Sequence, residues 1–161
     1  MNSAGISLPD TRPIAVMDSG VGGLSVLREI RRQLPCEDVI FFADQEHVPY
    51  GPRPQVELQR FSRGITQFFI EQNAKAVVIA CNSASAAALH HLREVFPRVP
   101  FVGMEPAVKP AATHTRSGII GVIATEATSQ GELFASVVGR YADNIRVVTQ
   151  VCPDFVRLVE D

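Results

Sequence analysis

Six short apolar runs, most of them followed by a helical pattern, constrain the fold of this chain more than any other feature. The runs are continuous rather than alternating, which is typical of strands buried on both faces of a parallel sheet. We expect strands at Ile14–Met17, Val39–Ala43, Ala76–Ala80, Pro100–Gly103, Gly118–Ala124 and Ile145–Val151. We expect helices at Gly23–Gln33, Gln55–Gln72, Ser83–Val95, Ala107–Thr113 and Ser129–Ala142. This order predicts an α/β fold, in which helices flank a parallel sheet through right-handed crossovers.

The two ends of the chain carry weaker patterns. Residues 1–12 contain Pro9, several polar residues and no apolar core of signal-peptide length, so we expect a flexible leader there. At the other end, Val159-Glu160-Asp161 closes the chain without a helix stop signal. Two interpretations stay open at this end: a short final helix, or a chain that ends inside a domain.

Composition excludes several classes of partner. The 161 residues contain 15 Lys and Arg against 17 Asp and Glu, whereas nucleic-acid binders usually carry a basic face, so we expect no nucleic-acid partner. The apolar runs are far shorter than the roughly 18 residues of a membrane helix, so we expect no membrane partner. The three cysteines lack zinc-site spacing. We therefore expect no bound metal. We also expect free thiols, as in a reducing, cytoplasmic compartment.

Polar and reactive residues gather where the predicted strands end. Ligands of open α/β sheets bind outside the carboxyl ends of the strands. The six strand ends read Asp18-Ser19-Gly20, Asp44, Cys81-Asn82-Ser83, Glu105-Pro106, Thr125-Glu126 and Cys152-Pro153. Helix capping explains such residues about as well when each is taken singly, but the joint pattern favours a ligand-binding edge.

Cys81 is the residue best suited to a catalytic role. It follows a buried strand and precedes a helix, and a thiol beside a helix N-terminus has its thiolate favoured by the free N–H groups. The alternative is a small core residue, which is the commoner role of a cysteine after a buried strand. The neighbouring Asn82 and Ser83 favour the ligand site, because both can cap the helix and face a ligand. Cys36 and Cys152 are interpreted as structural or incidental.

The turn Gly20-Val21-Gly22-Gly23 resembles part of a dinucleotide fingerprint, but Ser25 stands where that fingerprint needs glycine. We interpret it as a tight turn whose free N–H groups face a small anion, such as a substrate carboxylate. The four histidines are interpreted as solvated or structural. An alternative stays open for His47, which lies close to Tyr50 and would line a pocket.

Lysine is scarce, and its placement bears on cofactors. A pyridoxal cofactor needs a Schiff-base lysine at the ligand-binding edge of the sheet. Lys75 lies at the start of the third predicted strand, which is the opposite edge, and Lys109 lies in a predicted helix. The sequence therefore disfavours pyridoxal.

Six ordered motifs between residues 14 and 160 carry a family resemblance. They are Met17-Asp18-Ser19-Gly20-Val21-Gly22-Gly23-Leu24-Ser25-Val26, Val48-Pro49-Tyr50-Gly51-Pro52, Ile79-Ala80-Cys81-Asn82-Ser83-Ala84-Ser85, Gly103-Met104-Glu105-Pro106-Ala107, Ile123-Ala124-Thr125-Glu126-Ala127-Thr128, and Val151-Cys152-Pro153 with Leu158-Val159-Glu160. Together they closely resemble the glutamate racemase family of aspartate/glutamate racemases.

The resemblance implies an isomerase that interconverts L- and D-glutamate without cofactor or metal and supplies D-glutamate for peptidoglycan synthesis. Two cysteines on opposite faces of the substrate would exchange the α-proton, and Cys81 matches the first. The substrate-binding positions of the family match Asp18, Ser19, Tyr50, Gly51, Asn82, Ser83 and Thr125. Glu160 matches an acid that supports the opposite face.

The chain departs from the family pattern at two points. Ser83 stands where the family usually has threonine, which keeps the hydroxyl. The Gly-Cys-Thr-His motif that holds the second cysteine is absent, so the resemblance implies an amino-terminal fragment that is inactive alone. Its domains would be residues 13–97, a first α/β domain without its carboxyl-terminal completion, and residues 98–161, part of a second, similar domain. For the full-length form the resemblance leaves a homodimer open.

Two other functions stay open at this stage. One is racemisation of aspartate or another amino acid within the same superfamily. The other is a non-catalytic amino-acid-binding module, which the missing second cysteine makes reasonable for this chain.

Overall fold

The computed structural model describes residues 10–161, so most of the leader expected at residues 1–12 lies outside the described residues. The strands are β1 (Ile14–Asp18), β2 (Val39–Ala43), β3 (Ala76–Ile79), β4 (Phe101–Gly103), β5 (Ile119–Ala124) and β6 (Arg146–Val151). The helices are α1 (Leu24–Gln33), α2 (Gln55–Glu71), α3 (Asn82–Val95), α4 (Val108–His114), α5 (Glu126–Gln130), α6 (Glu132–Tyr141) and α7 (Asp154–Glu160). The predicted α/β class is confirmed.

A four-stranded parallel sheet in the order β2-β1-β3-β4 forms the larger part of the molecule. The register pairs Met17 of β1 with Phe42 on one side and Ile79 on the other. The carboxyl ends of β1, β2 and β3 therefore meet at one edge of the sheet. This geometry places the polar residues that follow each strand next to one another.

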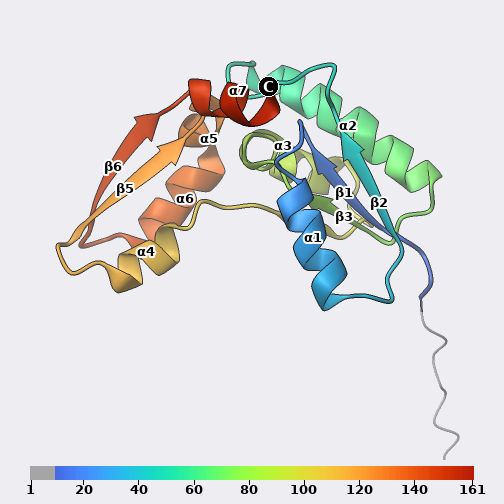
Figure 1. The fold of residues 1–161 in the computed structure, drawn as a ribbon, viewed down its shortest axis with the longest axis horizontal. Helices are drawn as coiled ribbons and strands as arrows, with labels where there is room; N and C mark the ends of the chain where they lie inside the picture. The colour runs from blue at the N-terminus through green and yellow to red at the C-terminus, as the bar shows by residue number, and fades with distance from the viewer. Residues whose placement is uncertain (1–9) are drawn as a thin grey trace, which may run out of the picture.

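Helices α2 and α3 pack against one face of this sheet, and α1 lies on the other (Figure 1). The apolar residues of β1 and β3 and the alanine-rich face of α3 are buried together with Leu58 and Phe69 of α2. In contrast, α1 buries none of its residues fully. The core of the larger part therefore lies between the sheet and the pair α2 and α3.

A second parallel sheet contains only β5 and β6, which pair from Ile119 with Arg146 to Ala124 with Val151. Helices α4 and α6 cover one face and form a separate small core with the sheet around Val108 and Val137. The second body lies beside the first in Figure 1, with α7 above the gap between the two ribbons.

The structure corrects the predicted helix at Ser129–Ala142. Two helices form instead, because the extended backbone of Gly131 (φ −71°, ψ 142°) separates α5 from α6. Helix α5 begins three residues earlier than predicted, since the Thr125 hydroxyl accepts a hydrogen bond from the Thr128 N–H and caps it. The final helix that the sequence left open does form, as α7. Every other predicted element agrees to within one residue at each end.

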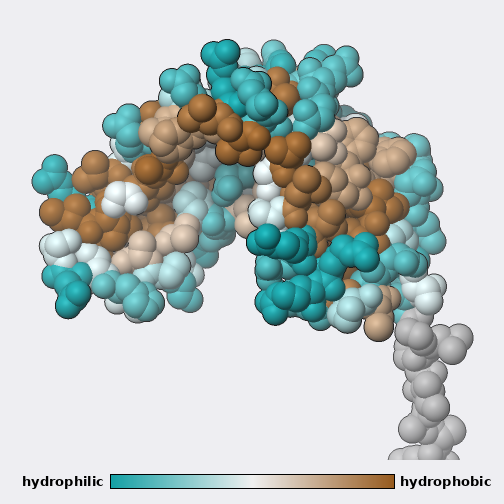
Figure 2. All heavy atoms as spheres, in the orientation of Figure 1, coloured by the Kyte–Doolittle hydropathy of each residue, from teal (hydrophilic) through white to brown (hydrophobic). Residues whose placement is uncertain are grey.

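Apolar side chains are exposed over the second body. Ile119, Ile123 and Val148 of the β5–β6 sheet, and Leu158 and Val159 of α7, are exposed. Figure 2 shows the apolar residues gathered along β5, β6 and α7. The predicted domain division after Pro97 stays a prediction, and β4, which follows that point, pairs with β3 in the first sheet.

None of the helices within residues 10–161 is both long and apolar enough to cross a lipid bilayer.

Candidate active site

The ends of β1 and β3 bring three of the predicted site residues together. The Ala80 N–H donates to the Met17 carbonyl over 2.8 Å, which holds the two chain segments side by side just past the strands. The Ser19 Oγ consequently lies 3.5 Å from the Cys81 Sγ. Asp18 and Cys81 are both buried.

Cys81 is the N-cap residue of α3, and its sulfur accepts a hydrogen bond from the Ala84 N–H over 3.4 Å. Burial raises the pKa of the thiol, and the negative charge of Asp18 raises it further. The contacts with Ser19 and Ala84 act in the opposite direction, because they stabilise the thiolate. Burial and Asp18 outweigh these contacts, so the pKa of the thiol lies above its usual value. A positive charge beside Asp18 would lower that pKa and favour the thiolate.

Asp18 shapes the turn that follows β1. Its Oδ2 accepts hydrogen bonds from the N–H groups of Gly20 (3.1 Å) and Gly23 (3.0 Å). Burial raises the pKa of this carboxyl, and the backbone hydrogen bonds partly offset that effect. A Cβ on Gly23 would lie 2.5 Å from the Asp18 Cβ, so the close approach requires glycine at this position.

The turn Gly20–Gly23 does bind a carboxylate, and that carboxylate comes from the chain itself. Both oxygens of Glu160 accept from the Val21 N–H, at 3.0 and 3.1 Å. Glu160 also lies against Gly20, where a Cβ would overlap its carboxylate. The contact joins α7 to the turn after β1 across most of the chain.

A second group of predicted residues meets where the two bodies touch. The hydroxyls of Ser83 and Thr125 lie 2.8 Å apart, and the Thr125 Oγ1 donates to the Thr128 Oγ1 over 3.0 Å. The Ala127 N–H donates to the Gly51 carbonyl over 3.0 Å. Gly51 also packs tightly against Thr125, since a Cβ at Gly51 would lie 2.9 Å from the Thr125 Cβ. The residues after β2, β3 and β5 are therefore joined directly.

Tyr50 is almost fully buried, and its hydroxyl donates to the Asp44 Oδ2 over 2.6 Å. His47 Nδ1 lies 2.8 and 3.0 Å from the two Asp44 oxygens. The imidazole also stacks on Phe61, with ring centroids 3.9 Å apart. These contacts favour the structural interpretation of His47, which stays a prediction.

Sequence reasoning gave Asp44 no role beyond its place at a strand end. The available signal was an acid at the end of β2 followed six residues later by a tyrosine that the resemblance places in the site. Their pairing depends on the loop between them, which residue types alone do not define.

Comparison with known proteins matches this arrangement to one family. A family model described as Asp/Glu/Hydantoin racemase matches residues 14–159. The chain belongs to this racemase family. The glutamate racemase of Stutzerimonas stutzeri A1501 is 51% identical over 148 residues, and that of Pseudomonas putida W619 is 55% identical over 148 residues. Both alignments cover 92% of this chain and 56% of the relative.

Solved racemase structures agree with the fold. The RacE1 glutamate racemase of Bacillus anthracis superposes with a TM-score of 0.83 at 38% identity, covering 93% of this chain and 56% of that one. The Francisella tularensis glutamate racemase, solved in complex with D-glutamate, gives a TM-score of 0.80 at 34% identity over 94% of this chain and 56% of that one. The resemblance inferred from the motifs is confirmed, and the chain spans somewhat more than half the length of these racemases.

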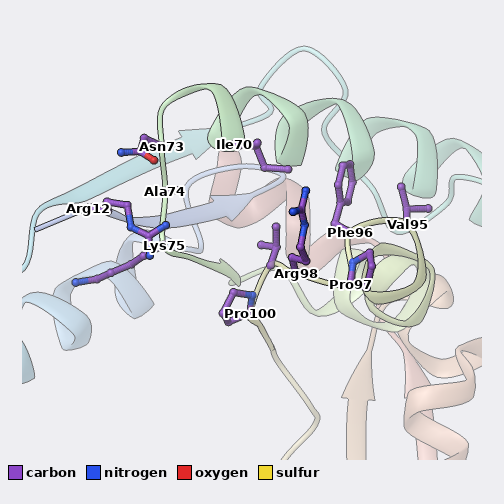
Figure 3. A pocket seen from close by; sticks show the side chains of 11 residues that line it. Arg12, Ile70, Asn73, Ala74, Lys75, Val95, Phe96, Pro97, Arg98 and Pro100 are labelled. Carbon is purple, nitrogen blue, oxygen red and sulfur yellow. The ribbon is translucent and has the colours of Figure 1, made fainter. Parts of the chain in front are cut away.

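Two cavities lie towards opposite edges of the first sheet. One, of about 580 Å³, is lined by Asn82 and Thr125 together with the ends of β5 and α7. The other, of about 420 Å³, lies beside Lys75 and Pro100, where β3 and β4 begin (Figure 3). Only the first contains residues that the sequence assigned to a site.

Among residues 10–161, no group of three or more His, Cys, Asp and Glu side chains is placed to hold a metal ion. Cys36 is exposed, whereas Cys152 is half-buried and lines the 580 Å³ cavity. The catalytic and substrate-binding roles given to the individual side chains stay predictions.

Proposed function

We propose that this chain provides one side of a glutamate racemase active site, in which Cys81 exchanges the α-proton on one face of the amino acid. The observation that carries the proposal is the position of the Cys81 thiol. It lies at the carboxyl edge of the sheet, in contact with Ser19 and beside Asp18. Its segment is matched by relatives whose curated name is glutamate racemase.

The proposed reaction needs no bound cofactor. As a thiolate, Cys81 removes the α-proton and becomes a thiol, and the bonding pair stays on the α-carbon as a carbanion. An acid on the opposite face then donates a proton to that carbon, which inverts its configuration. In the reverse direction Cys81 is the acid. Because an amino-acid α-proton is very weakly acidic, the site must also stabilise the developing negative charge.

The charges around Cys81 suit an amino-acid substrate. Burial and the negative charge of Asp18 raise the thiol pKa. The α-ammonium group of a substrate seated beside Asp18 would bring a positive charge next to the sulfur and lower that pKa. The thiolate would thus form chiefly when substrate is present, which limits side reactions of a reactive sulfur.

The remaining predicted residues would bind and orient the substrate. The exposed Asn82 amide can donate to a substrate carboxylate near the 580 Å³ cavity. The Ser83 and Thr125 hydroxyls, whose hydrogens are directed at Thr125 and Thr128, would donate to that carboxylate by rotating away from these partners. Tyr50 and Gly51 would form the adjoining wall. Glu160 would support the opposite face, where the second proton donor would come from the part of the enzyme that relatives have beyond the matched region. D-glutamate for peptidoglycan synthesis would be the product used by the cell.

The test uses a chimera of residues 1–161 with the carboxyl-terminal remainder of the Pseudomonas putida W619 racemase, the 55% identical relative. We expect it to convert L- to D-glutamate and the reverse, and to leave aspartate unchanged. Cys81→Ser should lower turnover from both enantiomers by a factor of about 100 or more, since positioned acid–base groups contribute that much. A serine hydroxyl is too weak an acid to replace the thiol.

The matched control is Cys36→Ser, because Cys36 is exposed and outside the site. Circular dichroism of both variants checks the fold. Near-normal racemisation by folded Cys81→Ser would show that Cys81 is a core residue. Turnover of aspartate in place of glutamate would assign the chain to a different substrate, and tight glutamate binding without turnover would favour a binding module.

A further inference from the structure

Two side chains behind the proposed site have no part in the proton transfer. Asp44 follows β2 and is 7% exposed, and its N–H donates to the Asp18 carbonyl over 2.9 Å. Its carboxylate accepts from the Tyr50 hydroxyl and meets His47 Nδ1. A buried carboxylate with three polar contacts is costly unless each contact is maintained, so its geometry is closely defined.

His47 is itself held from two sides. The face of its ring stacks on Phe61, with the planes inclined at 26°. The Arg53 Nε donates to the His47 carbonyl over 2.7 Å, and the Arg53 guanidinium lies 5.5 Å from the Phe61 ring centroid. The imidazole therefore presents Nδ1 to Asp44 from a fixed direction, and limits the rotation of that carboxylate.

Tyr50 connects the Asp44 carboxylate to the segment that lies against Thr125. Burial raises the pKa of its phenol, and the hydrogen bond to Asp44 raises it further, so the hydroxyl stays protonated and its hydrogen is committed to Asp44. The next residue, Gly51, accepts from the Ala127 N–H and lies against Thr125. Rotation or withdrawal of Tyr50 would therefore move Gly51 away from Thr125 and the start of α5.

We propose that Asp44 and His47 are positioning residues that hold the Tyr50–Gly51 segment against Thr125, and so define the substrate pocket without taking part in proton transfer. The inference rests on the proposed racemase function for its kinetic consequence. Its structural consequence is independent of that function, because the contact between Gly51 and Ala127 exists in the chain itself. Both consequences can be measured.

The first measurement uses the 161-residue chain and records exchange of the Ala127 amide hydrogen by nuclear magnetic resonance. Asp44→Ala and Tyr50→Phe should speed exchange at Ala127 and leave unchanged the exchange of the Phe96 amide, which caps the end of α3 by donating to the Leu92 carbonyl. Asp44→Asn, which keeps an acceptor for Tyr50, should restore slow exchange in part. Unchanged exchange at Ala127, or an equal rise at Phe96, would overturn the proposal.

The second measurement uses the chimera and both enantiomers of glutamate. A hydrogen bond to a charged group corresponds to roughly a tenfold or larger change in affinity. Asp44→Ala should therefore raise KM on the order of tenfold in both directions and leave kcat within about threefold. Because both groups act through one hydrogen bond, the double variant Asp44→Ala/Tyr50→Phe should be no worse than the poorer single variant.

Asp143→Asn, an exposed acid in the second body, is the matched control and should change neither constant. Additive effects of the two single variants, or a fall in kcat with KM unchanged, would overturn the proposal. An unmodified chimera without racemase activity would instead contradict the proposed function, and exchange at Ala127 would still decide the positioning role.

Discussion

Cys81 combines two roles at the scale of a single atom. Its sulfur caps α3 by accepting from the Ala84 N–H, and it is also the proposed base. Capping favours the thiolate, whereas burial and the neighbouring Asp18 disfavour it. These opposed influences mean that the reactivity of the thiol can be changed in either direction by neighbours that leave the sulfur itself intact.

The reactivity of Cys81 towards iodoacetamide should therefore respond to Asp18 and Ser19 with opposite signs. Asp18→Asn removes a negative charge that raises the thiol pKa, so alkylation of Cys81 at about pH 8 should become faster. Ser19→Ala removes a hydrogen bond that lowers the pKa, so alkylation should become slower. Mass spectrometry of the Cys81 peptide measures both rates, with the exposed Cys36 as an internal reference.

A rise in both variants would indicate loosened packing rather than charge, and would contradict the assignment. The pH profile gives a further check of sign. Because the pKa of Cys81 is raised, its alkylation should keep increasing at pH values where that of free cysteine has levelled off.

In the chimera, Asp18→Asn should also impair turnover from both enantiomers, because Asp18 would position the substrate for both directions of proton transfer.

Residue types and motif order were enough to predict which strand ends form the edge that holds Cys81. They were not enough to predict what each side chain contacts. In the structure the Val21 N–H of the turn Gly20–Gly23 donates to Glu160, which the sequence did not place there. The contact between Asp44 and Tyr50 depends on the loop that joins them. Such contacts depend on the conformation of the loops that lead back to this edge. The periodicity of apolar residues, 2 for strands and 3.6 for helices, predicts the elements but not the conformation of these loops.

At the scale of the elements, the turn between β1 and α1 is the most constrained segment near the site. Gly23 leaves room for Asp18 and for the ring of Phe41, and its conformation is an ordinary helical one (φ −62°, ψ −15°). Glycine is therefore required there for space rather than for backbone freedom. Gly64 of α2 differs in that nothing lies within 4 Å of a Cβ at its position.

Gly23→Ala should consequently destabilise the chain by about 1–3 kcal/mol, since the added methyl group must displace Asp18 or Phe41. Gly64→Ala is the matched substitution and should instead stabilise the chain by about 0.5–1 kcal/mol, because alanine loses less entropy within a helix. Urea unfolding followed by circular dichroism compares the two. Equal changes of either sign would contradict the close approach at Gly23.

Element boundaries were predictable wherever buried apolar runs and helical faces alternated, as in β2 and α2. The exception was the region of α5 and α6, where helix-forming residues continue across Gly131 without a proline. The break there comes from tertiary packing, because a Cβ on Gly131 would lie 2.6 Å from the Ala86 Cβ of α3. That contact joins segments that are far apart in sequence.

At the scale of the whole molecule, the two bodies differ in how well they are covered. The first sheet has helices on both faces, whereas the β5–β6 sheet and α7 expose a continuous set of apolar side chains (Figure 2). Ile123 is 64% exposed and Leu158 is 78% exposed. Exposed apolar surface on this scale is typical of an interaction or packing surface.

The isolated 161-residue chain should therefore bind the dye 8-anilinonaphthalene-1-sulfonate in its native state. Ile123→Thr removes exposed apolar surface from a strand while keeping a β-branched side chain. It should lower the dye fluorescence and change the free energy of unfolding by less than about 0.5 kcal/mol. A native chain that binds no dye and unfolds in one sharp transition would contradict this prediction.

We also expect the isolated chain to lack racemase activity, because the proposed mechanism needs a second acid on the face opposite Cys81. Within residues 10–161, the other two thiols are Cys36, which is exposed, and Cys152, which is half-buried. The resemblance matches neither of them to that role. Polarimetry of pure L-glutamate with the chain and with the chimera measures the difference. Conversion by the chain alone, abolished by Cys81→Ala, would show that a different group provides the second proton.

The Glu160 carboxylate acts as an intramolecular ligand of the Val21 N–H in the turn after β1. A tethered carboxylate is presented at an effective concentration that the fold determines and that dilution does not change. Any free carboxylate that takes the Val21 N–H must displace it, so the apparent affinity for that ligand is scaled by the fraction of molecules in which the turn is vacant. Occupancy of the turn and detachment of α7 are therefore thermodynamically linked, and a substitution that weakens the tether strengthens the binding of its competitor.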